Sequence, residues 1–276
     1  MSQLHHAKKN FFKRTIDYVF LTSFFGKSIF WIISIFSKIV NFLEYHSFLI
    51  NLINNKVVLK GPFKGLKYYK KISACGALEP RLLGVYEAEL HGTIYEFSNN
   101  KYQGIINVGA AEGYYAIGLS MLFPNLPVRA YETDPEVAKY TSAMIMHNNR
   151  EKHIELIEKD SFENLRKVKS NECFLIIVDC EGCEFKLFNK EIIENSKSSD
   201  LIIEMHCNNF DRTELESSFA TSHHVSRIYS KDRDLTNKEY SDLNLSVENF
   251  HKIISLENRT PHHYFLVLKS KKVRNK

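Results

Sequence analysis

An alternation of apolar runs with helical patterns after residue 100 restricts the fold more than any other feature of this chain. The apolar runs predict strands at Gly104–Val108, Val128–Glu132, Ile154–Ile157, Cys173–Asp179 and Leu201–His206. Helical patterns predict helices at Tyr114–Leu122, Pro135–His147, Phe162–Lys167, Phe185–Asn195 and Arg212–Ala220. Largely apolar strands that alternate with helices form a parallel sheet with helices on both faces. The sequence therefore predicts a doubly wound, Rossmann-like α/β fold.

The flanking segments complete this prediction. Two further strand-like runs, His224–Ser230 and His263–Lys269, are separated by a polar stretch with only weak helix signals. They predict a final strand that returns antiparallel within the same sheet. Upstream, Lys56–Tyr69 predicts a short β-hairpin around a Gly-Pro…Gly turn, and Gly84–Ser98 predicts a helix that leads into the sheet.

A loop of small residues follows the first predicted strand of the sheet. Gly109 and Gly113 allow a tight turn and let a ligand lie against bare backbone, and the next helix begins with free N–H groups. Glu132 ends the second strand, nineteen residues after Gly113, where a carboxylate can accept hydrogen bonds from both hydroxyls of a ribose. These features predict a nucleoside site.

The spacing of the loop separates the nucleoside cofactors. Asn107-x-Gly109-x-x-x-Gly113 lacks the middle glycine of the Gly-x-Gly-x-x-Gly dinucleotide fingerprint, and Glu112 in the loop would repel a pyrophosphate. A cationic sulfonium cofactor, S-adenosyl-L-methionine, is therefore favoured over NAD.

The same segments carry a family resemblance. NVGAAEGYYAIGLS, AYETDPE, LIIVDCEGCEFKLF and LIIEMHC, with GVYEAELHG upstream, resemble the FkbM-type branch of class I S-adenosylmethionine-dependent methyltransferases over about residues 80–210. The resemblance implies the seven-stranded methyltransferase sheet and methyl transfer to a small-molecule oxygen, commonly on sugars or polyketides. The chain departs from the family at Asn107, where an acidic residue is usual, and the segment before residue 80 has no counterpart.

Carried over to this sequence, the resemblance implies a set of site residues. Those on the cofactor side are Asn107, Gly109, Ala111, Gly113, Glu132, Asp160 and Ser161. Asp179 and Glu181 would face the methyl group and the acceptor. Five of these positions also have a structural alternative: Gly109 and Gly113 as turn residues, Glu132 and Glu181 as solvated loop charges, and Asp160 as a helix N-cap.

Catalysis of methyl transfer needs alignment of the acceptor and removal of its proton. His206 ends the strand expected beside Asp179, and an imidazole that titrates near neutrality is a candidate general base. The alternative is a structural histidine at the strand end.

The five cysteines are too few and too irregularly placed for a disulfide framework. Cys180-Glu-Gly-Cys183 has the spacing of a redox or zinc element, but only His206 and Cys207 could readily supply a second ligand pair. We therefore expect no metal centre, and expect Cys183 to be a small apolar residue packed beside the sheet.

The amino-terminal region differs from the rest in charge. Residues 1–71 hold twelve basic and two acidic residues, a formal charge of +10 in a chain of +5. Helical spacing over Lys27–Tyr45 gives a narrow polar stripe and a wide apolar face, which predicts a helix lying in the plane of an anionic membrane surface. Placing Lys27 inside a membrane span would cost about 2.5–3.5 kcal/mol. A helical lid on the catalytic domain, or a homodimer seam, remains the alternative, and nucleic acid is disfavoured because aliphatic residues separate the lysines.

Two domains are expected from this division: an extension over residues 1–71 and a methyltransferase domain over residues 72–276. We expect O-methylation of a carbohydrate or lipid-linked glycan, in the cytoplasm and at the inner face of the membrane. The competing functions are a nicotinamide-dependent oxidoreductase, a non-catalytic nucleoside-binding module and a membrane scaffold without cofactor.

Overall fold

A computed structural model describes residues 24–158, 162–206, 209–230, 240, 242–243, 245–258 and 264–272. The chain divides into two compact units, residues 1–51 and 52–276. The first unit contains most of α2 (Phe24–Asn55), a continuous helix of 32 residues.

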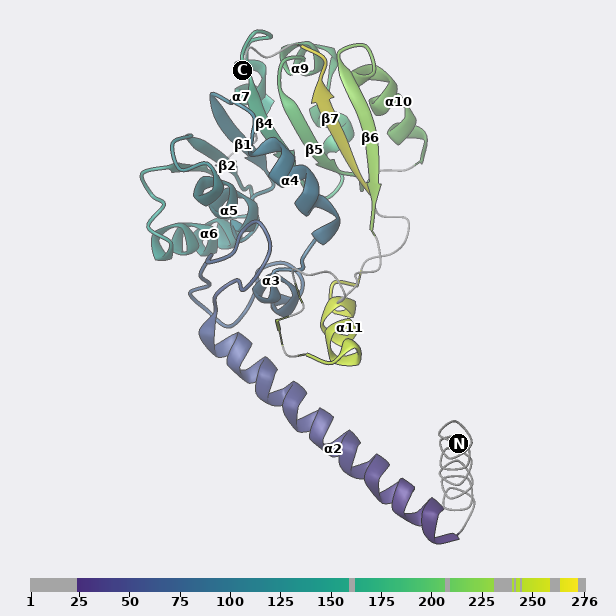
Figure 1. Cartoon of the computed structure of the whole chain (residues 1–276). Coiled ribbons are helices and arrows are strands. Elements are labelled where there is room, and N and C mark those ends of the chain that lie inside the picture. Colours follow the sequence, from purple (N-terminus) through teal and green to yellow (C-terminus); the bar gives the residue numbers. More distant parts are fainter. Residues whose placement is uncertain are drawn as a thin grey trace, which may run out of the picture. The chain divides into compact units, whose positions relative to one another are not determined.

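Seven strands form one sheet in the second unit (Figure 1). They are β1 Gly104–Val108, β2 Val128–Tyr131, β3 Ile154–Ile157, β4 Phe174–Val178, β5 Asp200–Glu204, β6 His223–Tyr229 and β7 Tyr264–Ser270. Their order in the sheet is β3-β2-β1-β4-β5-β7-β6. β1 to β5 are parallel, and β7 runs antiparallel to both β5 and β6. The predicted doubly wound sheet with an antiparallel last strand is confirmed.

Helices cover both faces of the sheet because its central strands are apolar on both sides. The helices are α3 Leu78–Leu83, α4 His91–Phe97, α5 Tyr114–Leu122, α6 Pro135–His147, α7 Phe162–Arg166, α8 Glu184–Leu187, α9 Lys190–Asn195, α10 Asn209–Phe219 and α11 Val247–Ser255. Side chains of α7 to α10 pack with Val108, Val178 and Ile203 in one buried cluster. α5 packs on β1 and β2.

The predicted helix over Gly84–Ser98 is wrong in its first half. α3 ends before Gly84, which is left-handed (φ 80°), and a 3₁₀ turn over Ala88–Leu90 precedes α4. A side chain at Gly84 would collide with the backbone of Lys60. The break therefore comes from a tertiary contact between distant segments, which helical spacing does not report.

Three other elements differ from expectation. The hairpin over Lys56–Tyr69 is a single β-bridge between Val57 and Lys67. Val58, Phe63 and Leu66 of this segment are buried. The helix predicted over Phe185–Asn195 is divided into α8 and α9, because Asn189 caps α9 by accepting a hydrogen bond from Ile192 N–H (3.0 Å). A well-formed helix, α11, occupies part of the polar stretch before β7.

Candidate functional site

A cavity of about 600 Å³ opens at the carboxyl ends of β1, β2, β4 and β5. Its walls come from the loops that follow these strands, from residues 75–81 and from the end of α11. The order of the sheet reverses between β1 and β4, and doubly wound folds bind ligands at this switch point. The volume lies in the range of cofactor sites.

The loop after β1 forms one wall of the cavity. Gly109 and Ala111 line it, and both have left-handed backbone (φ 74° and 46°). Gly113 does not line it. Gly113 caps α5, and a β-carbon there would lie 3.2 Å from side-chain atoms of Ile117 and Thr141. The second glycine therefore serves the packing of α5 against α6.

Gly109 is required by the fold more than by a ligand. A β-carbon at this position would coincide with the carbonyl oxygen of Asp179, because the ends of β1 and β4 meet there. The sequence predicts a tight turn and room for a ligand at Gly109, and the structure adds this close contact with the backbone of Asp179 as a third reason for the glycine.

We expect Gly109→Ala to lower the free energy of unfolding by about 2–3 kcal/mol, because a left-handed backbone and a backbone collision act together. Urea unfolding followed by circular dichroism measures this. Gly182→Ala is the matched control, since Gly182 also has positive φ (101°) but open space around it. If both variants lost the same free energy of unfolding, the collision with Asp179 would contribute nothing to the loss in Gly109→Ala.

Glu132 lies immediately after β2, as the sequence predicts, and lines the cavity. Its carboxylate accepts hydrogen bonds from the backbone N–H of Ala111 (2.8 Å) and of Asp134 (2.9 Å). These two bonds fix the carboxylate between the loop after β1 and the start of α6. Each oxygen keeps a second lone pair, so the group can still accept hydrogen bonds from a diol.

The remaining predicted cofactor residues are placed differently. Asn107 is buried in β1 and does not line the cavity, and its side-chain amide has no hydrogen-bond partner within the described chain. Asp160 and Ser161 lie outside the described residues, as does Cys207.

Glu112 does not face the cavity, contrary to its expected role in repelling phosphate. It is buried, lies 3.1 Å from Nε of Arg81, and accepts hydrogen bonds from Tyr68 Oη (3.1 Å) and Ser73 Oγ (2.7 Å). Arg81 itself lines the cavity and stacks on the ring of Tyr86, 4.0 Å from its centroid. Sequence analysis missed Arg81, because nothing near it in the chain indicates a buried partner.

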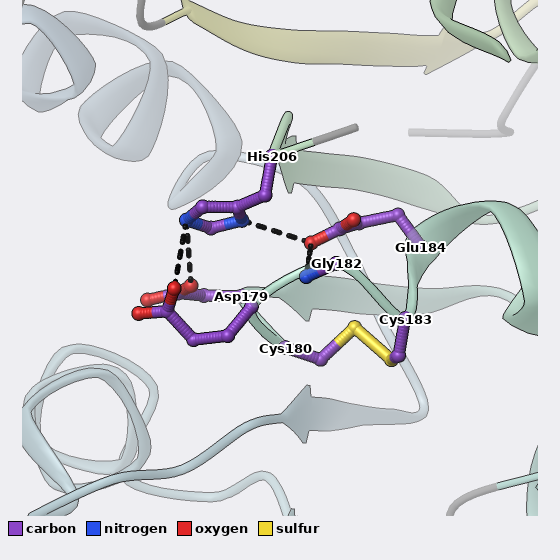
Figure 2. Close-up of a disulfide and its surroundings, with 7 residues drawn as sticks. Asp179, Cys180, Gly182, Cys183, Glu184 and His206 are labelled. Carbon is purple, nitrogen blue, oxygen red and sulfur yellow. Dashed lines mark hydrogen bonds and ion pairs between the residues drawn. A yellow bond between two sulfur atoms is a disulfide. The ribbon is translucent and has the colours of Figure 1, made fainter. Parts of the chain in front are cut away.

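The three predicted catalytic residues, Asp179, Glu181 and His206, come together at the ends of β4 and β5. Figure 2 shows Asp179 and His206 at this point. Nε2 of His206 lies 3.5 Å from a carboxylate oxygen of Glu181 and 3.8 Å from one of Asp179. A carboxylate oxygen of Glu204 also lies 3.8 Å from Nε2. All four side chains line the cavity.

Glu184 is a functional candidate that sequence analysis missed. It is fully buried at the start of α8 and lies 2.9 Å from Nδ1 of His206, with the same oxygen accepting from Gly182 N–H (3.1 Å). This bond orients the imidazole with Nε2 toward Asp179, as Figure 2 shows, and within 3.5 Å of Glu181. The three acidic residues of Asp-Cys-Glu-Gly-Cys-Glu indicate a polar site after β4. The sequence does not show that the last of them, Glu184, contacts His206.

His206 does not have the near-neutral pKa expected of it. Burial opposes the charged ring, but the hydrogen bond to Glu184 and the charges of Glu204 and Asp179 outweigh burial and raise the pKa of His206 to about 9. In the ligand-free protein the ring is therefore protonated at neutral pH, and its Nε2 cannot accept a proton there.

Titration of His206 tests this environment. In chelator-treated protein, NMR of the histidine ring should give a midpoint near pH 9. This pKa exceeds the value of about 6.5 in the unfolded chain, so protonated His206 stabilises the folded protein. This contribution to the free energy of unfolding is fully present below about pH 6.5 and is lost as pH rises through about 9. His206→Gln should therefore lose more stability at pH 6 than at pH 10. A midpoint near 6.5 would contradict the carboxylate environment described above.

Cys180 and Cys183 form a disulfide (Figure 2), a pairing that the sequence analysis did not predict. The tight turn at Glu181 and Gly182 (φ 52° and 101°) brings the two α-carbons to 5.4 Å, which is within bonding range. Cys183 also packs against the core beside the sheet, as expected. The disulfide closes the loop that carries Glu181.

No protein-family model matches the chain, and no curated protein matches it. Solved structures of several methyltransferases are similar to part of the chain. Precorrin-6y C5,15-methyltransferase from Geobacter metallireducens is 13% identical, with a TM-score of 0.42 over 66% of this chain and 89% of that chain. An rRNA methylase from Streptococcus thermophilus is 9% identical (TM-score 0.43, 67% and 97% covered). Human methyltransferase 10 domain containing protein is 12% identical (TM-score 0.39, 67% and 80% covered). Identities this low do not transfer an activity, so the activity has to be inferred from the cavity itself.

Proposed function

We propose that the protein is an S-adenosylmethionine-dependent methyltransferase of the FkbM type that methylates a hydroxyl of a carbohydrate or lipid-linked glycan. The observation that carries the proposal is the charge of the cavity at the switch point of the sheet. Among its described lining residues, five carboxylates (Glu132, Asp179, Glu181, Glu204 and Glu257) face one guanidinium (Arg81) and one imidazole (His206). Such a site favours a sulfonium and an ammonium over the pyrophosphate of NAD.

The residues present fit the parts of S-adenosylmethionine. Glu132 offers a fixed carboxylate for the ribose diol, and the loop of Gly109 and Ala111 offers bare backbone beside it. Arg81 supplies a cation for the carboxylate of the methionine portion. When bound, the cofactor supplies an activated methyl group.

The protein's own contribution to the reaction is orientation and proton removal. Asp179 and Glu181 can accept a hydrogen bond from an acceptor hydroxyl, which aligns its oxygen for an in-line displacement. Because His206 is already protonated, Asp179 is the better candidate for the group that takes the hydroxyl proton. The imidazolium, held by Glu184, would hold the Asp179 side chain in place.

The choice of a hydroxyl-rich acceptor is supported by the same carboxylates. Several hydrogen-bond acceptors at one end of the cavity match the several donors of a sugar ring, whereas an acceptor with a phosphate near its reactive hydroxyl would be repelled.

Calorimetry on the full chain with S-adenosylmethionine, S-adenosylhomocysteine and NAD tests the cofactor. We expect both sulfur compounds to bind and NAD to be at least about tenfold weaker, because the pyrophosphate would face the carboxylates. Binding of NAD with no binding of S-adenosylmethionine would favour the oxidoreductase. Cofactor binding without turnover on any glycan acceptor would favour a non-catalytic binding module.

We further propose that residues 1–50 attach this enzyme to an anionic membrane surface at the cytoplasmic side. By length and composition, Ser28–Asn55 of α2 could span a membrane (mean hydropathy 1.3), and large apolar side chains are exposed along it, among them Trp31, Phe36 and Ile39. A span would place Lys38 and Glu44 near the bilayer centre, at about 2.5–3.5 kcal/mol for the lysine alone. A helix in the membrane plane keeps Ser34, Lys38 and Asn41 on its polar side.

Trp31 is the single tryptophan of the chain, and 67% of it is exposed, so it reports directly on this attachment. Anionic vesicles at low salt should shift its fluorescence to shorter wavelength, while high salt or neutral vesicles should weaken the shift, because each basic residue near the surface contributes up to about 1 kcal/mol. Replacing Phe36 and Ile39 with serine should reduce the shift, and replacing Ser34 with alanine should not. An unchanged spectrum with anionic vesicles at low salt would favour a lid or a dimer contact.

A further inference from the structure

We infer that Asp179, Glu181 and His206 form a binding site for a divalent transition-metal ion at the acceptor end of the cavity. One ligand atom from each, a carboxylate oxygen or a ring nitrogen, lies within 4.8 Å of the other two. Glu181 is 85% exposed, and Asp179 and His206 are partly exposed on the cavity wall, so an ion can enter. This site differs from the Cys-x-x-Cys element considered above, whose sulfurs are joined to each other.

The distances around His206 are those of metal ligands more than those of hydrogen bonds. Nε2 lies 3.5 Å from Glu181 and 3.8 Å from Asp179, which exceeds the 2.7–3.2 Å of an ordinary hydrogen bond to nitrogen. Two ligands about 2.1 Å from one ion, at angles of roughly 110–130°, lie roughly 3.4–3.8 Å apart. Both distances from Nε2 therefore match two ligands on one ion, and the Asp179 and Glu181 oxygens lie within 4.8 Å of each other.

The other nitrogen of the ring has the partner typical of a metal-bound histidine. Nδ1 lies 2.9 Å from an oxygen of the fully buried Glu184, and Gly182 N–H holds that oxygen in turn (Figure 2). Histidines that bind metal usually donate their second N–H to a carboxylate or carbonyl, which orients the ring and makes the free nitrogen a better ligand. With Nδ1–H donated to Glu184, a binding ion displaces the proton of Nε2 into solvent and takes up the lone pair that this proton leaves.

The charges around His206 also favour a bound metal ion. Asp179, Glu181, Glu184 and Glu204 place four carboxylates within 3.8 Å of one imidazole, in a partly buried region. Carboxylates gathered at one point repel one another, most strongly where they are shielded from water as Glu184 and Glu204 are, and a cation among them offsets this repulsion. A divalent ion would offset two of these charges at the point where three of the carboxylates converge on Nε2.

The ligand set selects the kind of ion and what it can do. One imidazole and two carboxylates suit Mn²⁺, Fe²⁺ or Zn²⁺ better than Mg²⁺ or Ca²⁺, which prefer oxygen ligands. Three protein ligands leave coordination positions open, and these can hold the hydroxyl oxygens of an acceptor and lower the pKa of the one that reacts. The metal-free reaction expected from sequence would then become metal-assisted.

The site is tested by titrating the chelator-treated full chain with MnCl₂. Calorimetry measures the binding, and electron paramagnetic resonance identifies the ligands of the bound ion. We expect one Mn²⁺ per chain and a ¹⁴N coupling from His206 that is lost in His206→Asn. Glu181→Gln should weaken Mn²⁺ binding at least about tenfold, since even partners of metal ligands contribute 10–100-fold. Glu181 is an exposed loop side chain, so this change leaves the fold intact.

Glu155→Gln is the matched control, because Glu155 is an exposed carboxylate on β3 that lies beside Arg129. The Glu155→Gln variant should bind Mn²⁺ as tightly as the unaltered chain does. Absence of Mn²⁺ uptake, or equal uptake by Glu181→Gln and the unaltered chain, would overturn the inference. S-adenosylhomocysteine binding is measured on the same samples. If the chain binds S-adenosylhomocysteine but takes up no Mn²⁺, the metal site alone is overturned. If it takes up Mn²⁺ but does not bind S-adenosylhomocysteine, the proposed cofactor alone is overturned.

Discussion

Glu132→Ala is expected to weaken the binding of S-adenosylhomocysteine at least about tenfold. The carboxylate lies at the end of β2 with both oxygens held by backbone N–H groups, so it is already placed for the two ribose hydroxyls. Hydrogen bonds to a charged group contribute about 1.5–3 kcal/mol each, and each 1.4 kcal/mol is a factor of ten in affinity. Calorimetry on the full chain measures the loss.

Glu132→Gln is the matched variant for this test. A glutamine can still accept from the N–H of Ala111, so the loop after β1 keeps its support while the charge is removed. We expect its affinity to lie between those of the unaltered chain and Glu132→Ala. Unchanged affinity for S-adenosylhomocysteine in a folded Glu132→Ala variant would show that the cofactor does not bind at Glu132.

Asp179→Asn is expected to lower methyl-transfer turnover by about 10²–10⁴-fold while leaving S-adenosylhomocysteine affinity within a few-fold. Removing a group that takes a proton in the transition state has an effect of this size. The measured quantity is the rate of S-adenosylhomocysteine formation with a glycan acceptor. His206→Asn should show a loss in the same direction, because the imidazolium lies 3.8 Å from Asp179 and helps to hold it.

Glu257→Gln is the matched control for turnover, because Glu257 lines the same cavity but is not among the four carboxylates around His206. Its turnover should change less than about tenfold. Retained turnover in Asp179→Asn would move proton removal to Glu181, and loss of cofactor binding in that variant would assign Asp179 to the cofactor and not to the acceptor.

The local spacing of residues determined the sheet and one wall of the cavity. Alternating apolar runs and helical patterns specify the strands and helices, and a right-handed crossover leaves few ways to connect them. Gly109 and Glu132 were placed at the carboxyl ends of β1 and β2 because strand ends are visible in the chain itself. The same reasoning brought Asp179 and His206 together, since both end neighbouring strands.

Tertiary structure alone decided which polar groups pair, and therefore the chemistry available at His206. Glu184 lies beneath an imidazole 22 residues away, and Arg81 pairs with Glu112 across the loop after β1. Neither pair has a periodicity that sequence spacing could report. The break at Gly84 likewise arises from contact with Lys60. Burial and charge at a site depend on distances between segments that are remote in the chain, so the pKa of His206 follows from the packing of β4, β5 and α8 and not from the residues beside it.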